Sequence, residues 1–542
     1  MTLTPLLYHR ERNTVQRRAK WGIENGLGHT TKAVSLPSAL VAFQTRMKVR
    51  CETLGGRLHE AEFKEEEMDE AAPRGSGTGG RRPITRENLL IVIAASMIGL
   101  IYGYDLGSIA TAIIFLQPDF HLSDFMVSVV TTAVVVGQLF GAFFAGQISN
   151  RIGRKNTMIA VALGYAAFTG LQGIAPNEWF LTVVRFLLGL IIGVSIVTAP
   201  AYIAESAPKS VRGSMLVTFQ IATTSGIAIA YFVGLALAST ESWRLILSLA
   251  AIPAIIVLLL VIRLPETARG LMMLGRREEA VEVLRQVDPD MDAEEEADII
   301  QRDLSYEEQG SFSELFRGPF RRAGIFVVGL GFLVQITGIN AFVYFSPTII
   351  QKVGVQSTQE TFLATGLIQV AGVIAEIVSF SLVDRWGRRP VLLTGITCMG
   401  IANAILVIAY LLGPSVVLAL AGMLLFIVAF NFGYGSLVWA YASESFPARL
   451  RTQGGSAMLS SDLFANIIVG VVFLSALGAL GGSLTFGIFL VLSIFAFFFV
   501  YTLAPEVKGR QLEDIRTYWY NGGRWPTEGE GATAGAARSG RV

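Results

Sequence analysis

The sequence has few charged residues for its length. Only 16% of its 542 residues are Asp, Glu, Lys or Arg, and 52% are hydrophobic, whereas soluble domains are about 25% charged. A soluble chain of this size would divide into domains and cover each of them with charge. Here the charge lies in short stretches between long apolar runs. An ordinary soluble protein is therefore excluded.

Other scarcities exclude further classes of protein. The two cysteines, Cys51 and Cys398, are far apart in the sequence, so neither a disulfide framework nor a zinc-ligand spacing is present. A net charge of +1 leaves no basic surface of the kind that nucleic acid requires. With four histidines and no nucleophile–base or nucleotide motif, we expect no enzyme, no cofactor and no metal site.

The first part of the chain differs from the rest. Residues 1–85 are polar and contain the runs EFKEEEMDE and PRGSGTGGRRP, and no signal-peptide core precedes the first apolar run. We predict a disordered N-terminal tail in the cytoplasm. Met68 lies within it, and one hypothesis is that the natural chain starts there.

The remainder predicts an all-α membrane protein with 12 transmembrane helices, because each apolar run is close to the ~20 residues that cross a bilayer. The runs are 88–116, 125–148, 156–175, 178–203, 212–237, 243–263, 321–350, 361–383, 389–411, 414–441, 452–477 and 480–503.

The distribution of positive charge predicts the orientation. If both termini are cytoplasmic, the external loops together hold one basic residue, Lys352, while the internal loops carry RIGRK, PKSVR, RWGRR and PARLR. This asymmetry follows the positive-inside rule. We expect a multi-pass, monomeric protein of the plasma membrane, with the lipid bilayer as a partner.

Three motifs recur at a nearly constant spacing. E-S-x-P-x3-R occurs at 205–212 and again 239 positions later, R-x-G-R-K/R at 151–155 and 234 later, and Pro-Glu at 265–266 and 240 later. Such spacing predicts two homologous six-helix halves, one of the transporter repeat plans. The expected parts are the halves 86–263 and 321–503, a cytoplasmic helical linker 264–320 and a cytoplasmic tail 504–542.

The first two motifs lie at predicted cytoplasmic helix ends. Their carboxylates and guanidinium groups suit bidentate pairs that hold an inner gate closed, or the arginines simply anchor the topology. The residues concerned are Arg151, Arg154, Glu205, Arg212, Arg385, Arg388, Glu444 and Arg451.

Longer motifs resemble the sugar porter family of the major facilitator superfamily. They are PAYIAESAPKSVRG at 200–213, VQITGIN at 334–340 and PEVKGRQLEDI at 505–515, together with the two R-x-G-R loops. The resemblance covers about 88–515. It implies a secondary transporter that moves a sugar or related small polar metabolite by alternating access, with protons.

The chain departs from the family pattern at several places. Asn150 stands where the family has Asp, Val334 where it has a sugar-binding Gln, and Asp462 where it has a sugar-binding Asn; GYGSLVW at 433–439 lacks the usual prolines. These departures support an alternative on the same fold, a facilitator or exporter of a non-sugar metabolite such as an organic acid. A non-transporting nutrient sensor is a third hypothesis.

Four ionisable residues lie within predicted spans, namely Asp105, Arg185, Glu376 and Asp462. Such groups are costly in lipid and face a cavity or a partner. The resemblance implies that Asp105 carries the coupled proton and pairs with Arg185; the alternative is a static ion pair. Gly99, Gly103 and Gly107 give the helix around Asp105 a small-residue face for close packing.

Neutral amides and aromatic residues complete the expected site. The amides offer the donors and acceptors that complement a polyol, and the resemblance implies sugar contacts for them; the alternative is interhelical bonding. The substrate-site residues are Gln220, Gln335, Asn340, Phe345, Trp439, Asp462 and Asn466. Tyr344 is expected at the external gate. For Glu376 a second proton site, a substrate contact and a bond to a neighbouring helix all stay open.

Overall fold

The computed structural model describes residues 86–206, 212–287, 292–307, 312–413, 415–446, 448–508, 510 and 512–525, with some side chains inside these ranges left out. The chain divides at Arg81–Arg82 into two units, and the described residues all belong to the second. The predicted disorder of residues 1–85 therefore lies outside the description. All regular structure in the described ranges is helical, which confirms the all-α class.

The helices follow one another with short connections. In chain order they are α3 (Arg86–Asp119), α4 (Asp124–Ile152), α5 (Arg154–Gly173), α6 (Glu178–Ser206), α7 (Arg212–Leu237), α8 (Trp243–Ser248), α9 (Ala251–Ile262), α10 (Ala268–Met273), α11 (Arg277–Val287), α12 (Ala293–Glu307), α13 (Arg321–Ile336), α14 (Ile339–Lys352), α15 (Thr358–Trp386), α16 (Arg388–Leu411), α17 (Val416–Phe430), the π-helix η4 (Asn431–Gly435), α18 (Ser436–Glu444), α19 (Ala448–Leu503) and α20 (Leu512–Tyr520).

Within the described ranges, ten helical segments are long and apolar enough to cross a membrane. The last of them, Leu450–Leu503, has 54 residues, and Gly481 interrupts it with φ 76° and ψ 167°. It is thus two helices joined at a sharp bend. Helix α5, at the predicted run 156–175, is not one of the ten.

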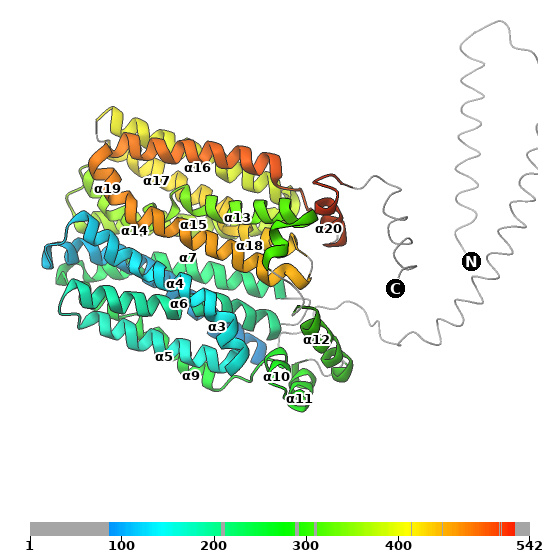
Figure 1. Cartoon of the computed structure of the whole chain (residues 1–542). Helices are drawn as coiled ribbons and strands as arrows, with labels where there is room; N and C mark the ends of the chain where they lie inside the picture. Colours follow the sequence, from blue (N-terminus) through cyan, green and yellow to red (C-terminus); the bar gives the residue numbers. More distant parts are fainter. Residues whose placement is uncertain are drawn as a thin grey trace, which may run out of the picture. The chain divides into compact units, whose positions relative to one another are not determined.

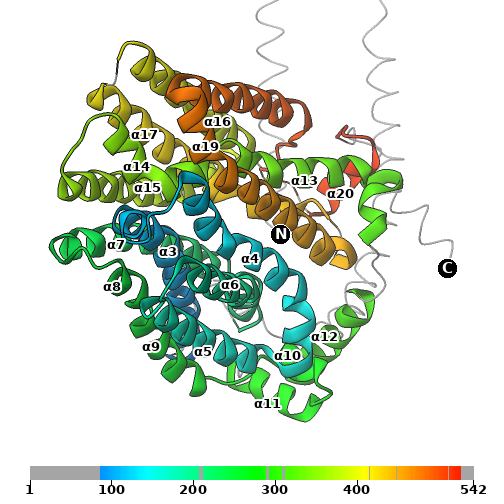
Figure 2. The ribbon, with the colours of Figure 1, turned by 60° about the vertical axis from the view of Figure 1, so that its left-hand side comes forward.

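The spanning helices pack in two groups, which we call the first group (α3–α9) and the second group (α13–α19). Within the first group α3 packs on α7 and α4 on α6, and within the second group α19 packs on α13 and α16. Figures 1 and 2 show the blue-to-teal helices of the first group together on one side of the yellow-to-orange helices of the second. The groups meet where α7 packs on α15, α4 on α19 and α3 on α14.

Glycines let helices of the first group approach backbone to backbone. A Cβ on Gly103 would stand 1.8 Å from the carbonyl oxygen of Thr223 in α7, and one on Gly137 would stand 2.1 Å from that of Phe186 in α6. Small residues permit such approach in lipid, where packing drives helix association. The predicted small-residue face of Gly99, Gly103 and Gly107 is therefore confirmed.

Two spans of the second group are broken near the polar motifs. Gly338, at φ 110°, separates α13 from α14, inside the VQITGIN motif. The five-residue π-helix η4 separates α17 from α18, in the span that lacks the family's prolines. A π-helix interrupts regular helical hydrogen bonding, so the α-helical pattern of this span is interrupted without a proline.

The same cap is built twice at one end of the helices. The Glu266 carboxylate accepts hydrogen bonds from the backbone N–H groups of Arg154 (2.9 Å) and Lys155 (3.0 Å), the first residues of α5. The Glu506 carboxylate accepts the equivalent bonds from Arg388 and Arg389 (both 3.2 Å), the first residues of α16. These carboxylates satisfy N–H groups that a helix start leaves free.

The glycine before each of these helices makes room for the carboxylate. Gly153 has φ 89° and Gly387 has φ 97°. A Cβ there would stand 2.2 Å from Oε2 of Glu266 or 2.7 Å from Oε2 of Glu506. The tyrosine partners also match, since Tyr202 bonds the carbonyl of Pro265 and Tyr441 that of Pro505. The repeated motifs thus have repeated geometry.

We expect Glu266→Gln and Glu506→Gln to destabilise the protein by similar amounts, about 1–3 kcal/mol each, because each removes charged hydrogen bonds to a helix start. Thermal unfolding of the protein in detergent measures this. Glu282→Gln is the matched control, since Glu282 is exposed on α11 and bonds only to Gln286 among the described residues. Equal stability of all three variants would contradict the cap assignment.

Candidate functional site

A buried ion pair lies between α3 and α6. Nη1 of Arg185 is 3.6 Å from Oδ1 of Asp105, and the two residues are 0% and 2% exposed. Arg185 also donates from Nε to the carbonyl of Val130 (3.0 Å) and from Nη1 to Oε1 of Gln172 (3.1 Å). The expected partners are therefore together, and the distance is longer than that of a hydrogen bond.

The pair is incomplete. Among the described residues, Oδ2 of Asp105 and Nη2 of Arg185 have no hydrogen-bond partner. Gly103 and Gly107 lie against α7, and Asp105, two positions from each, points to the opposite side of α3 because a helix turns about 100° per residue. The carboxyl consequently faces α6 with one oxygen free.

A cluster of amides and one carboxyl lies in the second group. Nδ2 of Asn340 donates to Oε1 of Gln335 (2.6 Å), and the Asp462 carboxyl lies beside the Gln335 side chain. Nδ2 of Asn466 lies 3.4 Å from the Tyr344 hydroxyl. The break at Gly338 places Gln335 at the end of α13 and Asn340 at the start of α14, and Asn340 is 7% exposed.

Tyrosines connect this cluster to the ion pair. The Tyr344 hydroxyl lies near the side chains of Asp105, Arg185 and Asp462. The Tyr102 hydroxyl, on α3, lies near those of Asp105, Asp462 and Tyr344. Tyr344 is on α14, which packs on α3. The charges of one group and the amides of the other thus lie on two sides of the α3–α14 contact.

The other expected substrate residues lie differently. Gln220 of α7 is a neighbour of Glu376 in α15. The ring of Phe345 is fully buried and stacks on Phe473, with 5.6 Å between centroids. Trp439 is 42% exposed, and none of the described contacts joins it to the amide cluster. The structure brings seven of the expected residues together: Asp105, Arg185, Gln335, Asn340, Tyr344, Asp462 and Asn466.

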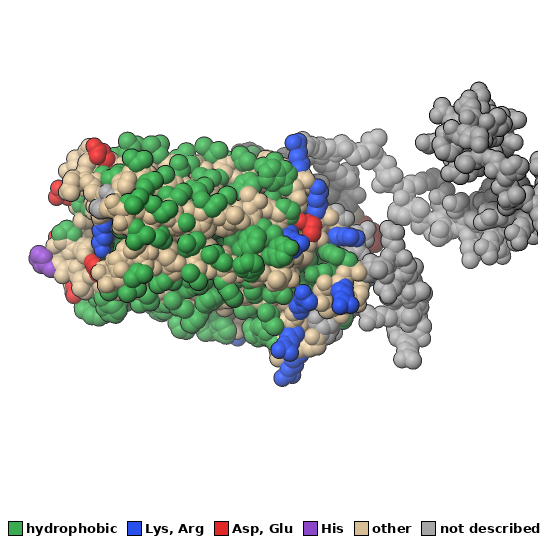
Figure 3. All heavy atoms as spheres, turned by 90° about the horizontal axis from the view of Figure 1, so that it is seen from above, with side chains coloured by type: hydrophobic (Ala, Val, Ile, Leu, Met, Phe, Trp, Pro, Cys, Tyr) green, Lys and Arg blue, Asp and Glu red, His purple; other side chains and the backbone are tan. Residues whose placement is uncertain are grey.

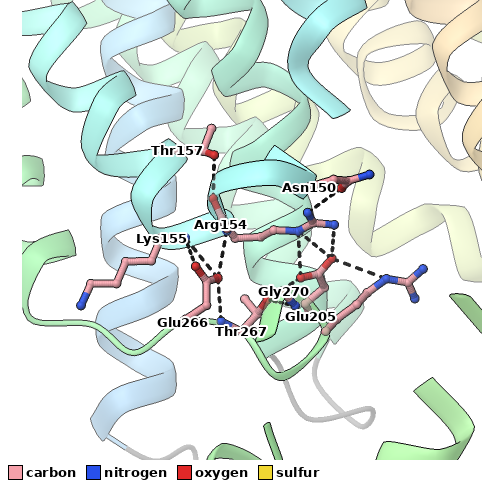
Figure 4. A network of polar contacts seen from close by, with 10 residues as sticks. Asn150, Arg154, Lys155, Thr157, Glu205, Glu266, Thr267 and Gly270 are labelled. Carbon is pink, nitrogen blue, oxygen red and sulfur yellow. Dashed lines mark hydrogen bonds and ion pairs between the residues drawn. The ribbon is translucent and has the colours of Figure 1, made fainter. Parts of the chain in front are cut away.

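Figure 4 shows the polar network at the capped end of α5. Nε of Arg154 donates to both carboxylate oxygens of Glu205 (3.3 Å each), and its Nη1 donates to Oδ1 of Asn150 (2.7 Å). The Thr267 hydroxyl donates to the same Glu205 carboxylate (2.7 Å), and Arg269 is 3.8 Å away. Asn150, where the family has Asp, thus retains an acceptor for Arg154 without adding a charge.

These contacts join α5 and α6 of the first group to the segment that directly follows α9. None of them reaches a described residue of the second group. In the second group Arg388 pairs with Asp384 at 3.6 Å, and the carbonyl of Arg385 accepts from Nζ of Lys508. Arg151 and Arg451 are exposed. The side chains of Arg212 and Glu444 lie outside the description.

Sequence reasoning missed several members of these networks. Burial raises the pKa of the Glu266 carboxyl above its ordinary value, while N–H donors from Thr267, Lys155 and Arg154 oppose that rise. The repeated Pro-Glu pair was the signal for Glu266, and it predicted the duplication without revealing the cap. Gln172 and Tyr102 had no such signal. Within the described ranges, no group of three or more His, Cys, Asp or Glu is placed to hold a metal ion.

Comparison with known proteins gives a consistent result. The family described as sugar (and other) transporter matches residues 91–519. The galactose-proton symporter of Escherichia coli (strain K12) is 34% identical over 430 residues, which are 78% of this chain and 93% of that one. The arabinose-proton symporter of Bacillus subtilis (strain 168) is 30% identical over 451 residues, 81% and 97% of the two chains.

A solved structure agrees with the fold. The xylose transporter XylE from E. coli, in a partially occluded inward open conformation, matches with a TM-score of 0.69 and 23% identity, over 79% of this chain and 100% of that one. The motifs, the helical membrane architecture and the matched length all point the same way: the chain belongs to the sugar (and other) transporter family.

Proposed function

We propose that the chain spans the membrane 12 times, as two six-span halves at 86–263 and 321–503 joined by a linker at 264–320. Ten spanning segments support this, together with the bend at Gly481, which makes two spans of the last segment. Helix α5 supplies the remaining span because its 20 residues are enough to cross a bilayer. The duplicated carboxylate caps support the two halves.

The orientation follows from charge. In Figure 3, Lys and Arg side chains gather at the end of the molecule that carries α10–α12 and α20, while hydrophobic side chains cover the middle. Positive charge is retained on the cytoplasmic side. Both termini are therefore cytoplasmic in our proposal, the membrane is the plasma membrane, and the protein works as a monomer.

The protein is a secondary active transporter that moves a sugar together with a proton. The carrying observation is the half-satisfied Asp105–Arg185 pair on the opposite side of the α3–α14 contact from the amide cluster. Relatives named for galactose and arabinose are proton symporters. Exporting an organic acid is not favoured, because the carboxyl in the amide cluster, Asp462, would repel an anion rather than attract it.

The mechanism uses the pair as a switch. A proton on Asp105 removes its attraction for Arg185, and loss of the proton restores it. Gln335, Asn340 and Asn466 bind sugar hydroxyls with amide donors and acceptors. Because the two sets of residues belong to different halves, binding and protonation together bias how the halves rock about the site.

Asp105→Asn removes the protonatable group, so we expect it to abolish accumulation of sugar against a gradient while exchange across the membrane continues. Uptake of radiolabelled galactose, arabinose and xylose into vesicles with an imposed proton gradient measures this. Asp119→Asn is the control, since Asp119 lies at the end of the same helix and pairs with Arg244 at the surface. A variant at Asp105 that still concentrates sugar would overturn the assignment.

Asn340→Ala should raise KM for the transported sugar by about 5- to 20-fold, the value of one hydrogen bond. Asn403→Ala provides the comparison, because Asn403 is also a buried amide but bonds to Ser493 away from the site. Concentration-dependent exchange measures both. If the two variants have the same KM, Asn340 has only a structural role.

Arg154→Gln and Glu205→Gln should each slow transport, and the double variant should be no slower than the slower single one, because the two residues act as one gate contact. Initial rates of exchange measure the cycle. The exposed pair Arg276–Glu279 gives the control cycle, and its changes should have little effect. Additive losses at Arg154 and Glu205 would refute the gate.

A further inference from the structure

Glu376 is an ionisable side chain in the membrane region that has no role in the mechanism above. Glu376 lies in the second half of α15 and is 0% exposed. Neither of its carboxylate oxygens has a hydrogen-bond partner among the described residues. Unlike Asp105, which pairs with Arg185, it forms no ion pair with any arginine that the structure describes.

Glu376 lies at the contact between the two helix groups. Helix α15 packs on α7, and the contact is close: a Cβ on Gly366 of α15 would stand 3.3 Å from the ring of Phe232 of α7. The polar neighbours of the carboxyl are Gln220 and Thr224, both on α7. Both side chains are close enough to Glu376 to act on its carboxyl, but neither reaches hydrogen-bond geometry with it, and the Thr224 hydroxyl lies 3.4 Å from the Gln220 carbonyl of its own helix.

The surroundings contain no described charge that compensates a carboxylate. Besides α7, the elements packed against α15 are α14, α16, α17, η4 and α18, and α17 carries no titratable residue. Of the side chains that the structure describes on these elements, none forms an ion pair with Glu376. The titratable residues that they carry are Arg212 and Tyr231 on α7, Tyr344 and Lys352 on α14, Arg388, Arg389, Cys398 and Tyr410 on α16, Tyr434 in η4, and Tyr441 and Glu444 on α18.

The lack of polar partners around Glu376 determines whether its carboxyl binds a metal cation or a proton. A carboxylate buried without a partner costs several kcal/mol more than a neutral carboxyl. A bound cation would need more oxygen ligands, since Ca²⁺ and Mg²⁺ take six or more, and the described residues near Glu376 offer only Gln220 and Thr224. A proton needs no further ligand. While α7 and α15 are closed on each other, Glu376 is therefore most stable as a carboxylic acid.

We propose that Glu376 is a second proton-binding site, distinct from Asp105, and that its proton is required for α15 to close on α7. When the two helices separate, water reaches the carboxyl and the proton passes to water, leaving a solvated carboxylate. By linkage, whatever favours the closed contact also favours proton binding there. This inference rests on the proposed proton symport and adds a site to it.

The test uses the full-length protein in vesicles and exchange of radiolabelled galactose at equal pH on both sides. It is done in the Asp105→Asn background, so that Asp105 no longer titrates. Exchange should fall with rising pH, by about tenfold per pH unit on the alkaline side, the limit for one proton. Adding Glu376→Gln should abolish this fall, because glutamine stays neutral. Adding Glu360→Gln instead, at an exposed acid of the same helix, should leave it unchanged.

Each outcome is decisive. Identical pH profiles with and without Glu376→Gln overturn the second site but leave symport intact, and accumulation by Asp105→Asn alone refutes the coupling proposal itself. A requirement for sodium ions that Glu376→Gln removes would mean a cation site and also overturn the proton site. If Glu376→Gln does not fold, the wild-type protein is treated with dicyclohexylcarbodiimide, which modifies protonated carboxyls in apolar surroundings. Mass spectrometry should locate the label on Glu376, and its absence there contradicts the proposal.

Discussion

The whole arrangement depends on one constraint: a charge inside the bilayer must find its partner within the protein. Asp105 and Arg185 meet this condition only in part, since each retains one polar atom without a hydrogen bond and their closest approach is 3.6 Å. A fully bonded pair would be held in one geometry, and its carboxylate would take up a proton reluctantly. The incomplete pair is stable enough to fold and open enough to change state.

Close backbone packing between helices stabilises the protein although the Asp105–Arg185 pair is incompletely bonded. Because α3 contacts α7 through Gly103 and Gly107, the opposite side of α3 is free to place Asp105 against α6. The same device recurs between α4 and α6, where Gly137 and Gly193 lie against backbone atoms. Dispersion contacts at these crossings hold the helices without needing polar groups. The polar residues are thereby reserved for the centre, where the two helix groups meet.

The sequence predicted what depends on period and composition. Apolar runs gave the helices, and repeated motifs gave the paired geometry at Glu266 and Glu506. The pairing of Asp105 with Arg185 came from the resemblance to sugar porters, and not from period or composition. The sequence could not show that Phe345 stacks on Phe473 or that Trp439 stays partly exposed, because such facts depend on helix rotation. Nor could it show that Gln220 faces Glu376, since that contact joins two helices whose sequences carry no common pattern.

The duplication was kept at the ends of the helices and lost at their centre. A shift of 239 residues relates Glu205 to Glu444. The same shift from Asp105 reaches Tyr344, and from Arg185 it reaches Leu424, so neither charge of the pair is repeated in the second half. The caps have a structural task, satisfying the first N–H groups of a helix, and that task is the same in both places. The centre binds two ligands: a proton needs an ionisable group, which Asp105 supplies, whereas the hydroxyls of a neutral sugar can be bound by neutral amides such as Asn340. Because Asp105 and the amide cluster lie in different halves, motion of one half relative to the other is the event that couples binding of the proton at Asp105 to binding of the sugar.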